Sequence, residues 1–292
     1  VTTISLSSRL GWDRLRGARP GGAKAPTPMK AKGTTPRKRD RVPSPSPPRN
    51  LPDKKRTKST RGRSPEKKNG NRKGFTRSTS WSEAVRLAKH GAAAGADAVL
   101  IVSPYYNKPT QEGLYQHFSA VAKAVSVPVI VYDIPGRSIV KVDDATMARL
   151  AADHANIKGI KDATADVGRP TRLRNLLGAD FAQLSGEDAT ALPYLAAGGH
   201  GCISVTANIA PKLLSEMHAA WAAGDIATAQ SINERLLPLH DSMFCEASPG
   251  PVKYAAELLG VCSAETRLPL CEICLLYTSP SPRDQRGSAV GW

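Results

Sequence analysis

Two side chains suited to amine chemistry close neighbouring apolar segments of the sequence. Lys161 ends the segment IKGIK at 157–161, and Tyr132 ends VPVIVY at 127–132. Burial at the end of a strand desolvates a lysine, which disfavours its charged form and lowers its pKa. The neutral amine is the nucleophile that condenses with a ketone to form a Schiff base. A neighbouring phenol can relay the protons that such a condensation moves.

Each of these residues also has a purely structural interpretation. Lys161 would then extend its ammonium to solvent or pair with Asp162, and Tyr132 would be an amphipathic tyrosine at a strand end. Arg137 lies in a Pro-Gly turn after Tyr132. Its guanidinium has the geometry to clamp a carboxylate, but it would equally suit an exposed turn. Position alone leaves these alternatives open.

Five apolar segments are expected to position these side chains. They alternate with helical patterns, at 98–103, 127–132, 157–161, 181–185 and 201–205. Continuously apolar strands are buried on both faces, and helical crossovers between them imply parallel pairing. The carboxyl ends of parallel strands form one reactive edge, where Tyr105 and Tyr106 would also lie unless they pack at a subunit contact. The pattern predicts an α/β fold, either a doubly wound sheet or part of a (β/α)8 barrel.

Helices are predicted between and after these strands. Ser80 and Glu83 have the spacing of a capping box and predict a helix that ends at Gly91 or Gly95. Beyond residue 205 the pattern is entirely helical, over 210–223, 225–243 and 250–260. In the middle one of these helices, three leucines are expected to face a core, namely Leu236, Leu237 and Leu239.

The net charge of +16 comes from the first 80 residues. Positions 1–80 hold 23 of the 41 Lys and Arg residues but only 4 of the 25 Asp and Glu residues, and they are rich in Pro and Ser. Such a segment buries too little apolar surface to offset the entropy of ordering, so we expect 1–80 to be disordered. It would act either as a basic arm for nucleic acid or as a solvated leader foreign to the domain. We favour the leader, because single-strand binders interleave stacking aromatics with their charges and this segment does not.

The remaining composition excludes several classes of protein. No run approaches the ~18 apolar residues of a membrane span, and the start has no apolar secretory region, so we expect a cytoplasmic protein without a membrane partner. The five cysteines suggest reduced thiols. Cys271 and Cys274 have the spacing of half a zinc knuckle, but no second pair completes four ligands. We therefore expect no metal at this pair.

Several strings in the same order resemble one enzyme family. From about 82 to 270 the sequence is similar to the 4-hydroxy-tetrahydrodipicolinate synthases, or dihydrodipicolinate synthases, within the pyruvate-dependent class I aldolase superfamily. The matching strings are GADAVLIVSPYYNKPTQEGLYQHF, VPVIVYDIPGRS, IKGIKDATAD, QLSGEDATALPYLAAGGHGCISVTANIAP and LPLHDSMFCEASPGPVKYA. The resemblance implies a (β/α)8 barrel followed by C-terminal helices over 81–270, commonly assembled as a homotetramer.

The resemblance also implies a lyase that condenses pyruvate with L-aspartate 4-semialdehyde in lysine and diaminopimelate biosynthesis, without cofactor or metal. Carried over by matching motif, Lys161 would form the Schiff base with pyruvate. Tyr132 would donate and accept protons, and Tyr106 would join the relay of the neighbouring subunit. Sibling enzymes such as N-acetylneuraminate lyase or a keto-deoxy sugar acid aldolase would share Lys161 and Tyr132, and they are the nearest alternative.

The resemblance assigns further residues to substrate binding. Arg137 would hold the semialdehyde carboxylate, while Gly186 and Ile203 would line the pyruvate pocket. Tyr105 matches a position that contributes to lysine feedback inhibition in some members. Arg137 and the string SPYYNKP favour the synthase over its siblings. From a different class, a basic-tailed nucleic-acid-binding protein carrying an inactive barrel is the second alternative.

The sequence also departs from the family pattern at both ends. Three βα units should precede residue 81, and the second should carry a Gly-Thr-Thr-Gly-Glu turn that completes the proton relay and binds the pyruvate carboxylate. We assign no such role to Gly33, Thr34 and Thr35, which lie between lysines and prolines. Segments 1–80 and 271–292 are therefore expected to be foreign to the domain. We expect the polypeptide as written to be poorly soluble and essentially inactive, because five strands cannot close an eight-stranded barrel.

Overall fold

The centre of the structure, a computed structural model that describes residues 75–76 and 79–274, is a parallel six-stranded sheet. Its strands are β1 (Phe75–Thr76), β2 (Val99–Val102), β3 (Val129–Asp133), β4 (Ile157–Asp162), β5 (Ala182–Ser185) and β6 (Gly201–Cys202). They lie in sequence order, and each pairs in parallel with the next. A doubly wound sheet reverses its strand order at a switch point, so this order identifies the barrel type of α/β fold.

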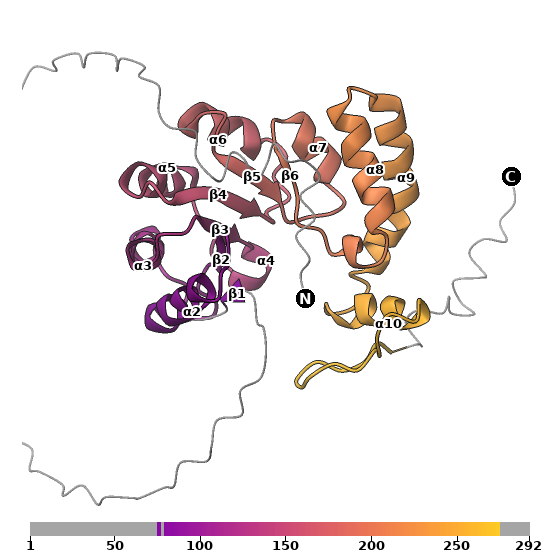
Figure 1. The fold of residues 1–292 in the computed structure, drawn as a ribbon, viewed down its shortest axis with the longest axis horizontal. Coiled ribbons are helices and arrows are strands. Elements are labelled where there is room, and N and C mark those ends of the chain that lie inside the picture. The colour runs from indigo at the N-terminus through magenta and orange to yellow at the C-terminus, as the bar shows by residue number, and fades with distance from the viewer. Residues whose placement is uncertain (1–74, 77–78, 275–292) are drawn as a thin grey trace, which may run out of the picture. The chain divides into compact units, whose positions relative to one another are not determined.

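A helix lies between each pair of consecutive strands. These helices are α2 (Trp81–Ala93), α3 (Gln111–Ala124), α4 (Pro135–Ser138) with α5 (Asp144–Asp153), α6 (Arg169–Leu177) and α7 (Ala191–Ala196). In Figure 1, helices α2, α3, α5 and α6 cover one side of the strands, as barrel crossovers do. After β6 come the short helix η1 (Thr206–Asn208), α8 (Pro211–Ala222), α9 (Ile226–Ser242) and α10 (Gly250–Leu258). Within the described residues, none of the helices is long and apolar enough to cross a membrane.

The sheet buries side chains on both faces, as the continuously apolar segments predict. Val129 and Val131 of β3 belong to the main core, which also contains Phe118 of α3 and Leu150 of α5. Ile130 belongs to a separate small cluster with Ala182 and Leu100. Because side chains alternate along a strand, Tyr132 faces the same side as Ile130, and Asp133 faces the helices with Val131.

The helices α8 and α9 form a second core together with α7. Leu214 and Met217 of α8 pack against Ile232 and Leu236 of α9, and these two helices stand side by side in Figure 1. The prediction for Leu236 is confirmed, whereas Leu237 is 42% exposed, so its expected place in the core is wrong. The helical period turns position 237 about 100° away from position 236, which explains the difference.

The five predicted strands are confirmed as β2 to β6, and the structure adds one. Strand β1 falls inside the range 1–80 assigned to the basic segment, so the sheet begins before residue 80. Most of the predicted basic segment and of the predicted tail 271–292 lies outside the described residues. Helix α2 does begin after Ser80, but the Ser80 side chain forms no cap hydrogen bond, and Glu83 pairs with Arg86 one turn along. The Ser80 half of the predicted capping box is therefore wrong.

Candidate active site at the carboxyl ends of the strands

Lys161 and Tyr132 lie directly opposite each other on neighbouring strands. They are register partners in β4 and β3, one residue from the carboxyl end of each strand. The Lys161 Nζ atom lies 4.2 Å from the centroid of the Tyr132 ring. Lys161 is only 7% exposed, and Tyr132 is partly buried. The structure therefore contradicts the interpretation of Lys161 as a solvated lysine at a strand end.

Burial changes the acid–base chemistry of this amine. Desolvation lowers the pKa of Lys161 from 10.5 to about 8, whereas Cys202 and Asp188 act in the opposite direction. Burial also raises the pKa of the Cys202 thiol well above its ordinary value. The thiol is therefore neutral near pH 7, which leaves Asp188 as the nearby anion. About one tenth of Lys161 is neutral at pH 7, compared with about 0.03% of an ordinary lysine.

Gly186 and the turn that contains it leave space beside the Lys161 amine. A Cβ atom on Gly186 would lie 3.0 Å from Lys161 Cε and 2.9 Å from Ala163 Cβ, so a larger residue there would push against the lysine. The Gly186 amide donates to the Asp162 carbonyl at 2.6 Å, which holds the turn after β5 against β4. Glycine at this position thus permits the close approach of the two strand ends.

Ile203 follows β6 and is buried at the neighbouring strand end. Its amide donates to the Ser185 carbonyl at 2.8 Å. The turn beyond it is held by Asp188, whose Oδ2 accepts from the amides of Val205 at 2.8 Å and Thr206 at 3.2 Å. Ile203 and Gly186 therefore lie at the same sheet edge as Lys161, where the sequence places them.

Three other predicted site residues have exposed side chains. Arg137 lies on α4, directly after β3. Tyr105 is 40% exposed and Tyr106 is 87% exposed in the loop after β2. Tyr106 also has a φ of 71°, a conformation that bulky residues rarely adopt. Backbone strain of this kind clusters at active sites and ligand contacts.

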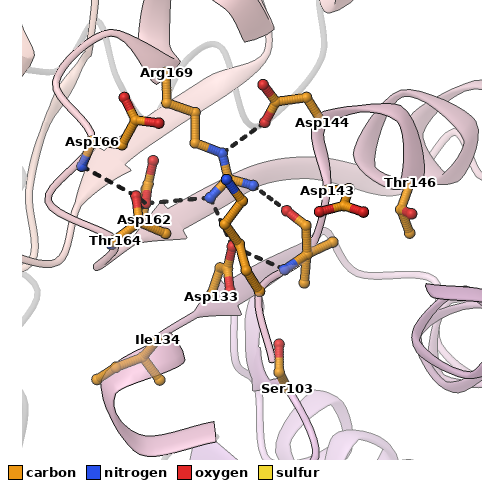
Figure 2. A network of polar contacts seen from close by, with 12 residues as sticks. Ser103, Asp133, Ile134, Asp143, Asp144, Thr146, Asp162, Thr164, Asp166 and Arg169 are labelled. Carbon is orange, nitrogen blue, oxygen red and sulfur yellow. Dashed lines mark hydrogen bonds and ion pairs between the residues drawn. The ribbon is translucent and has the colours of Figure 1, made fainter. Parts of the chain in front are cut away.

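Sequence reasoning missed a buried ionic network on the opposite face of the same two strands. Arg169, the first residue of α6, is fully buried and pairs with Asp133 at the end of β3 and Asp162 at the end of β4. Figure 2 shows its guanidinium between these carboxylates and that of Asp144, the first residue of α5. Asp162 therefore pairs with Arg169, which removes the alternative in which it neutralises Lys161.

The described residues give no sign of a metal centre. In residues 75–76 and 79–274, no group of three or more His, Cys, Asp or Glu side chains is arranged to hold an ion. Cys271 and Cys274 both have exposed, free thiols.

Comparison with known proteins identifies the family. A model of the dihydrodipicolinate synthetase family matches residues 74–277. The 4-hydroxy-tetrahydrodipicolinate synthase of Acidiphilium cryptum is 60% identical over 196 residues, which cover 67% of this chain and 67% of the relative. The chain thus spans about two thirds of the length of the curated relatives it matches.

Solved structures agree with the sequence relatives. The dihydrodipicolinate synthase of Aquifex aeolicus superposes with a TM-score of 0.67 at 41% identity, covering 70% of this chain and 69% of that one. The Acinetobacter baumannii enzyme, solved with pyruvate, gives a TM-score of 0.66 at 44% identity and covers 75% and 74% of the two chains. These findings favour neither the sibling aldolases nor a nucleic-acid-binding protein. The chain belongs to the dihydrodipicolinate synthetase family.

Proposed function

We propose that this chain carries the Schiff-base centre of a 4-hydroxy-tetrahydrodipicolinate synthase and that Lys161 is its nucleophile. The observation that carries the proposal is the buried Lys161 amine, 4.2 Å from the ring centroid of Tyr132 at the carboxyl ends of β4 and β3. Its pKa of about 8 makes a useful fraction of neutral amine available near pH 7. The identity to named synthases and the pyruvate in the A. baumannii structure support the choice of substrate.

The proposed reaction begins with attack of the neutral amine on the keto carbon of pyruvate. Loss of water gives a protonated Schiff base, which draws electrons from the adjacent methyl group. Loss of a methyl proton then gives an enamine, whose carbon attacks the aldehyde of L-aspartate 4-semialdehyde. The amino group of the semialdehyde displaces Lys161 by transimination, which closes the ring and regenerates the enzyme. Each step moves a proton locally, and the Tyr132 phenol is the proposed carrier.

The exposed residues would complete the site from its rim. We propose that Arg137 binds the carboxylate of the semialdehyde and that Gly186 and Ile203 border the pyruvate. Tyr106, exposed and held at positive φ, would reach the relay of a neighbouring subunit in a homotetramer. Tyr105, beside it, would take part in lysine inhibition.

The sequence contains no Gly-Thr-Thr-Gly-Glu turn, to which the resemblance assigns part of the proton relay and the pyruvate carboxylate. The step that we propose for the residues of this chain is therefore the formation of the Schiff base at Lys161. The first step needs only a neutral amine and a ketone, whereas the later steps need the full relay.

Trapping with pyruvate and borohydride tests this proposal. Reduction fixes the Schiff base as a stable adduct, and peptide mass spectrometry locates it. We expect the adduct on Lys161 in clear excess over Lys158, which is partly exposed on the same strand. The Lys161→Met variant should lose it. Equal labelling of the two lysines would refute the proposed nucleophile.

A further inference from the structure

We infer that Arg169 is a positioning residue that holds the Lys161–Tyr132 pair in place from the opposite face of the sheet. This inference rests on the proposed function of that pair. It assigns to α6 a role in the chemistry, although Arg169 points away from the reacting edge and would touch no substrate.

The contacts of the guanidinium join four elements of the fold. Nη1 donates to Asp133 Oδ2 at 2.7 Å and lies 3.4 Å from Asp162 Oδ1. Nε donates to Asp144 Oδ1 at 2.9 Å, and Nη2 donates to the Val142 carbonyl. The single side chain of Arg169 thus connects α6 to β3, β4 and the start of α5 (Figure 2). A planar fork with five N–H donors suits this task, whereas a lysine ammonium does not.

The chain links these contacts directly to the proposed site. Asp133 follows Tyr132, and Asp162 follows Lys161, and the two aspartates are register partners just as Lys161 and Tyr132 are. Because neighbouring residues of a strand face opposite sides, a contact that fixes one pair fixes the other. A slip of one residue would move a strand end by about 3.3 Å, nearly the full separation of the amine from the ring.

Both aspartates are also held by their own strands and turns. Asp162 Oδ1 accepts from the amide of Thr164 at 3.0 Å and from its hydroxyl at 2.7 Å. Asp133 Oδ2 accepts from the Val142 amide at 3.2 Å. Arg169 therefore bonds to carboxylates whose orientation is already set, so it can transmit position as well as charge.

Charge gives a second route from Arg169 to Lys161. Asp133 Oδ1 and Asp162 Oδ2 are buried without a hydrogen-bond partner in the described part of the chain. Without the guanidinium, these carboxylates would lose their positive partner one residue away from the amine, and burial, which already raises the pKa of Asp133, would neutralise part of the added negative charge. Their negative potential would favour the ammonium form of Lys161. Loosened strand ends would also admit water and favour the ammonium, so both effects act in the same direction.

Within the described residues, few other titratable or charged groups lie around Lys161 and could respond to a change at Arg169. Tyr132 faces it from β3, Cys202 from β6, and Asp188 acts on it from the turn after β5. The buried hydroxyl of Tyr194 on α7 is influenced by both Asp162 and Arg169. A change that starts at Arg169 would thus reach Lys161 through Asp133 and Asp162, which follow Tyr132 and Lys161 in their strands.

The test is the pH profile of pyruvate trapping at Lys161 in the full 292-residue chain. For Arg169→Gln, we expect the midpoint of the profile to move from about pH 8 to about pH 9, with a tenfold slower rate at pH 7 and the same plateau at high pH. Arg169→Lys should recover part of the shift, because it restores the charge but not the fork. Arg172→Gln is the matched control, since Arg172 pairs with Asp144 from the same helix but is half exposed and contacts neither Asp133 nor Asp162.

The outcomes separate this inference from the proposed function. If wild-type Lys161 is not labelled in preference to Lys158, the proposed function fails, and the inference fails with it. If Lys161 is labelled but the variants keep its midpoint and change only the folded fraction, Arg169 is merely structural and the inference alone is overturned. Should Arg169→Gln not fold, Arg169→Lys carries the test by itself, and an unchanged midpoint there overturns it.

Discussion

Replacing Lys161 with Met should stabilise the folded chain at neutral pH while removing the proposed nucleophile. The lysine is 7% exposed and is mostly protonated at pH 7, so the folded state must hold a buried ammonium. Methionine has a similar length and no charge, and it keeps the apolar contacts of the lysine stem. Removing a buried charge of this kind is expected to increase the free energy of unfolding.

The size of the effect follows from the pKa of Lys161. It falls from 10.5 in the unfolded chain to about 8 in the folded one, and each unit is worth about 1.4 kcal/mol. The ammonium therefore costs about 3 kcal/mol at pH 7. Between pH 8 and 10.5 the unfolded chain binds more protons than the folded chain, so the wild type gains stability as pH rises. At pH 9.5 the remaining cost is about 1.5 kcal/mol.

Urea unfolding at pH 7 and pH 9.5 measures this difference. The Lys161→Met variant should be more stable than the wild type at both values, with its advantage halved at the higher pH. Lys158→Met is the control, because its partly exposed side chain predicts a change within about 0.5 kcal/mol. A variant that is no more stable than the wild type at pH 7, or an advantage that does not shrink with pH, would refute the argument from burial.

Two further predictions concern the packing that holds the strands. Gly159→Ala would place a Cβ 2.4 Å from the Ala182 carbonyl oxygen. We therefore expect the free energy of unfolding, measured with urea, to fall by about 1–3 kcal/mol. Gly136→Ala is the control and should be almost neutral, because its Cβ would meet nothing within 4 Å. Leu173→Ala should lower the free energy of unfolding by about 2–5 kcal/mol in the same assay, because Leu173 is fully buried. Leu176→Ala is the matched control on the same helix; its side chain is exposed, so we expect a change below about 0.5 kcal/mol.

The sequence was sufficient to predict the strands and to place Lys161 and Tyr132 at one edge of the sheet, but position alone left open whether their side chains face inward. Both Lys161 and Tyr132 end a continuously apolar segment, and the parallel pairing of such segments brings their carboxyl ends to one edge. It was not sufficient for β1, because a strand of two residues is too short for any period to be recognised. The strand order, which excluded the doubly wound sheet, also depends on pairings between distant segments that periodicity does not specify.

The network around Arg169 could not be predicted for a different reason. Asp133 and Asp162 are unremarkable acidic residues after apolar segments, and Arg169 lies in a Gly-Arg-Pro turn that suggests only the start of a helix. Their burial depends on the outward face of two strands and the first turns of α5 and α6, which come together only in the fold. The available signal was the alternation itself: residues one step beyond an inward-facing pair must face the helices, and a charge there needs a partner.

Because the inner face must stay clear for a substrate, the ends of β3 and β4 cannot be fixed by packing on that side. Gly186 has no side chain to fill the space beside Lys161 Cε, and the lysine itself destabilises the folded state by about 3 kcal/mol at pH 7. The helix side is a direction from which the register of these strand ends can be held without occupying the substrate face. Arg169 holds the strand ends from that side. Its planar guanidinium bonds to both strands at once, one residue beyond the Lys161–Tyr132 pair. The separation lets the site keep a reactive amine without relying on contacts that a substrate would have to displace.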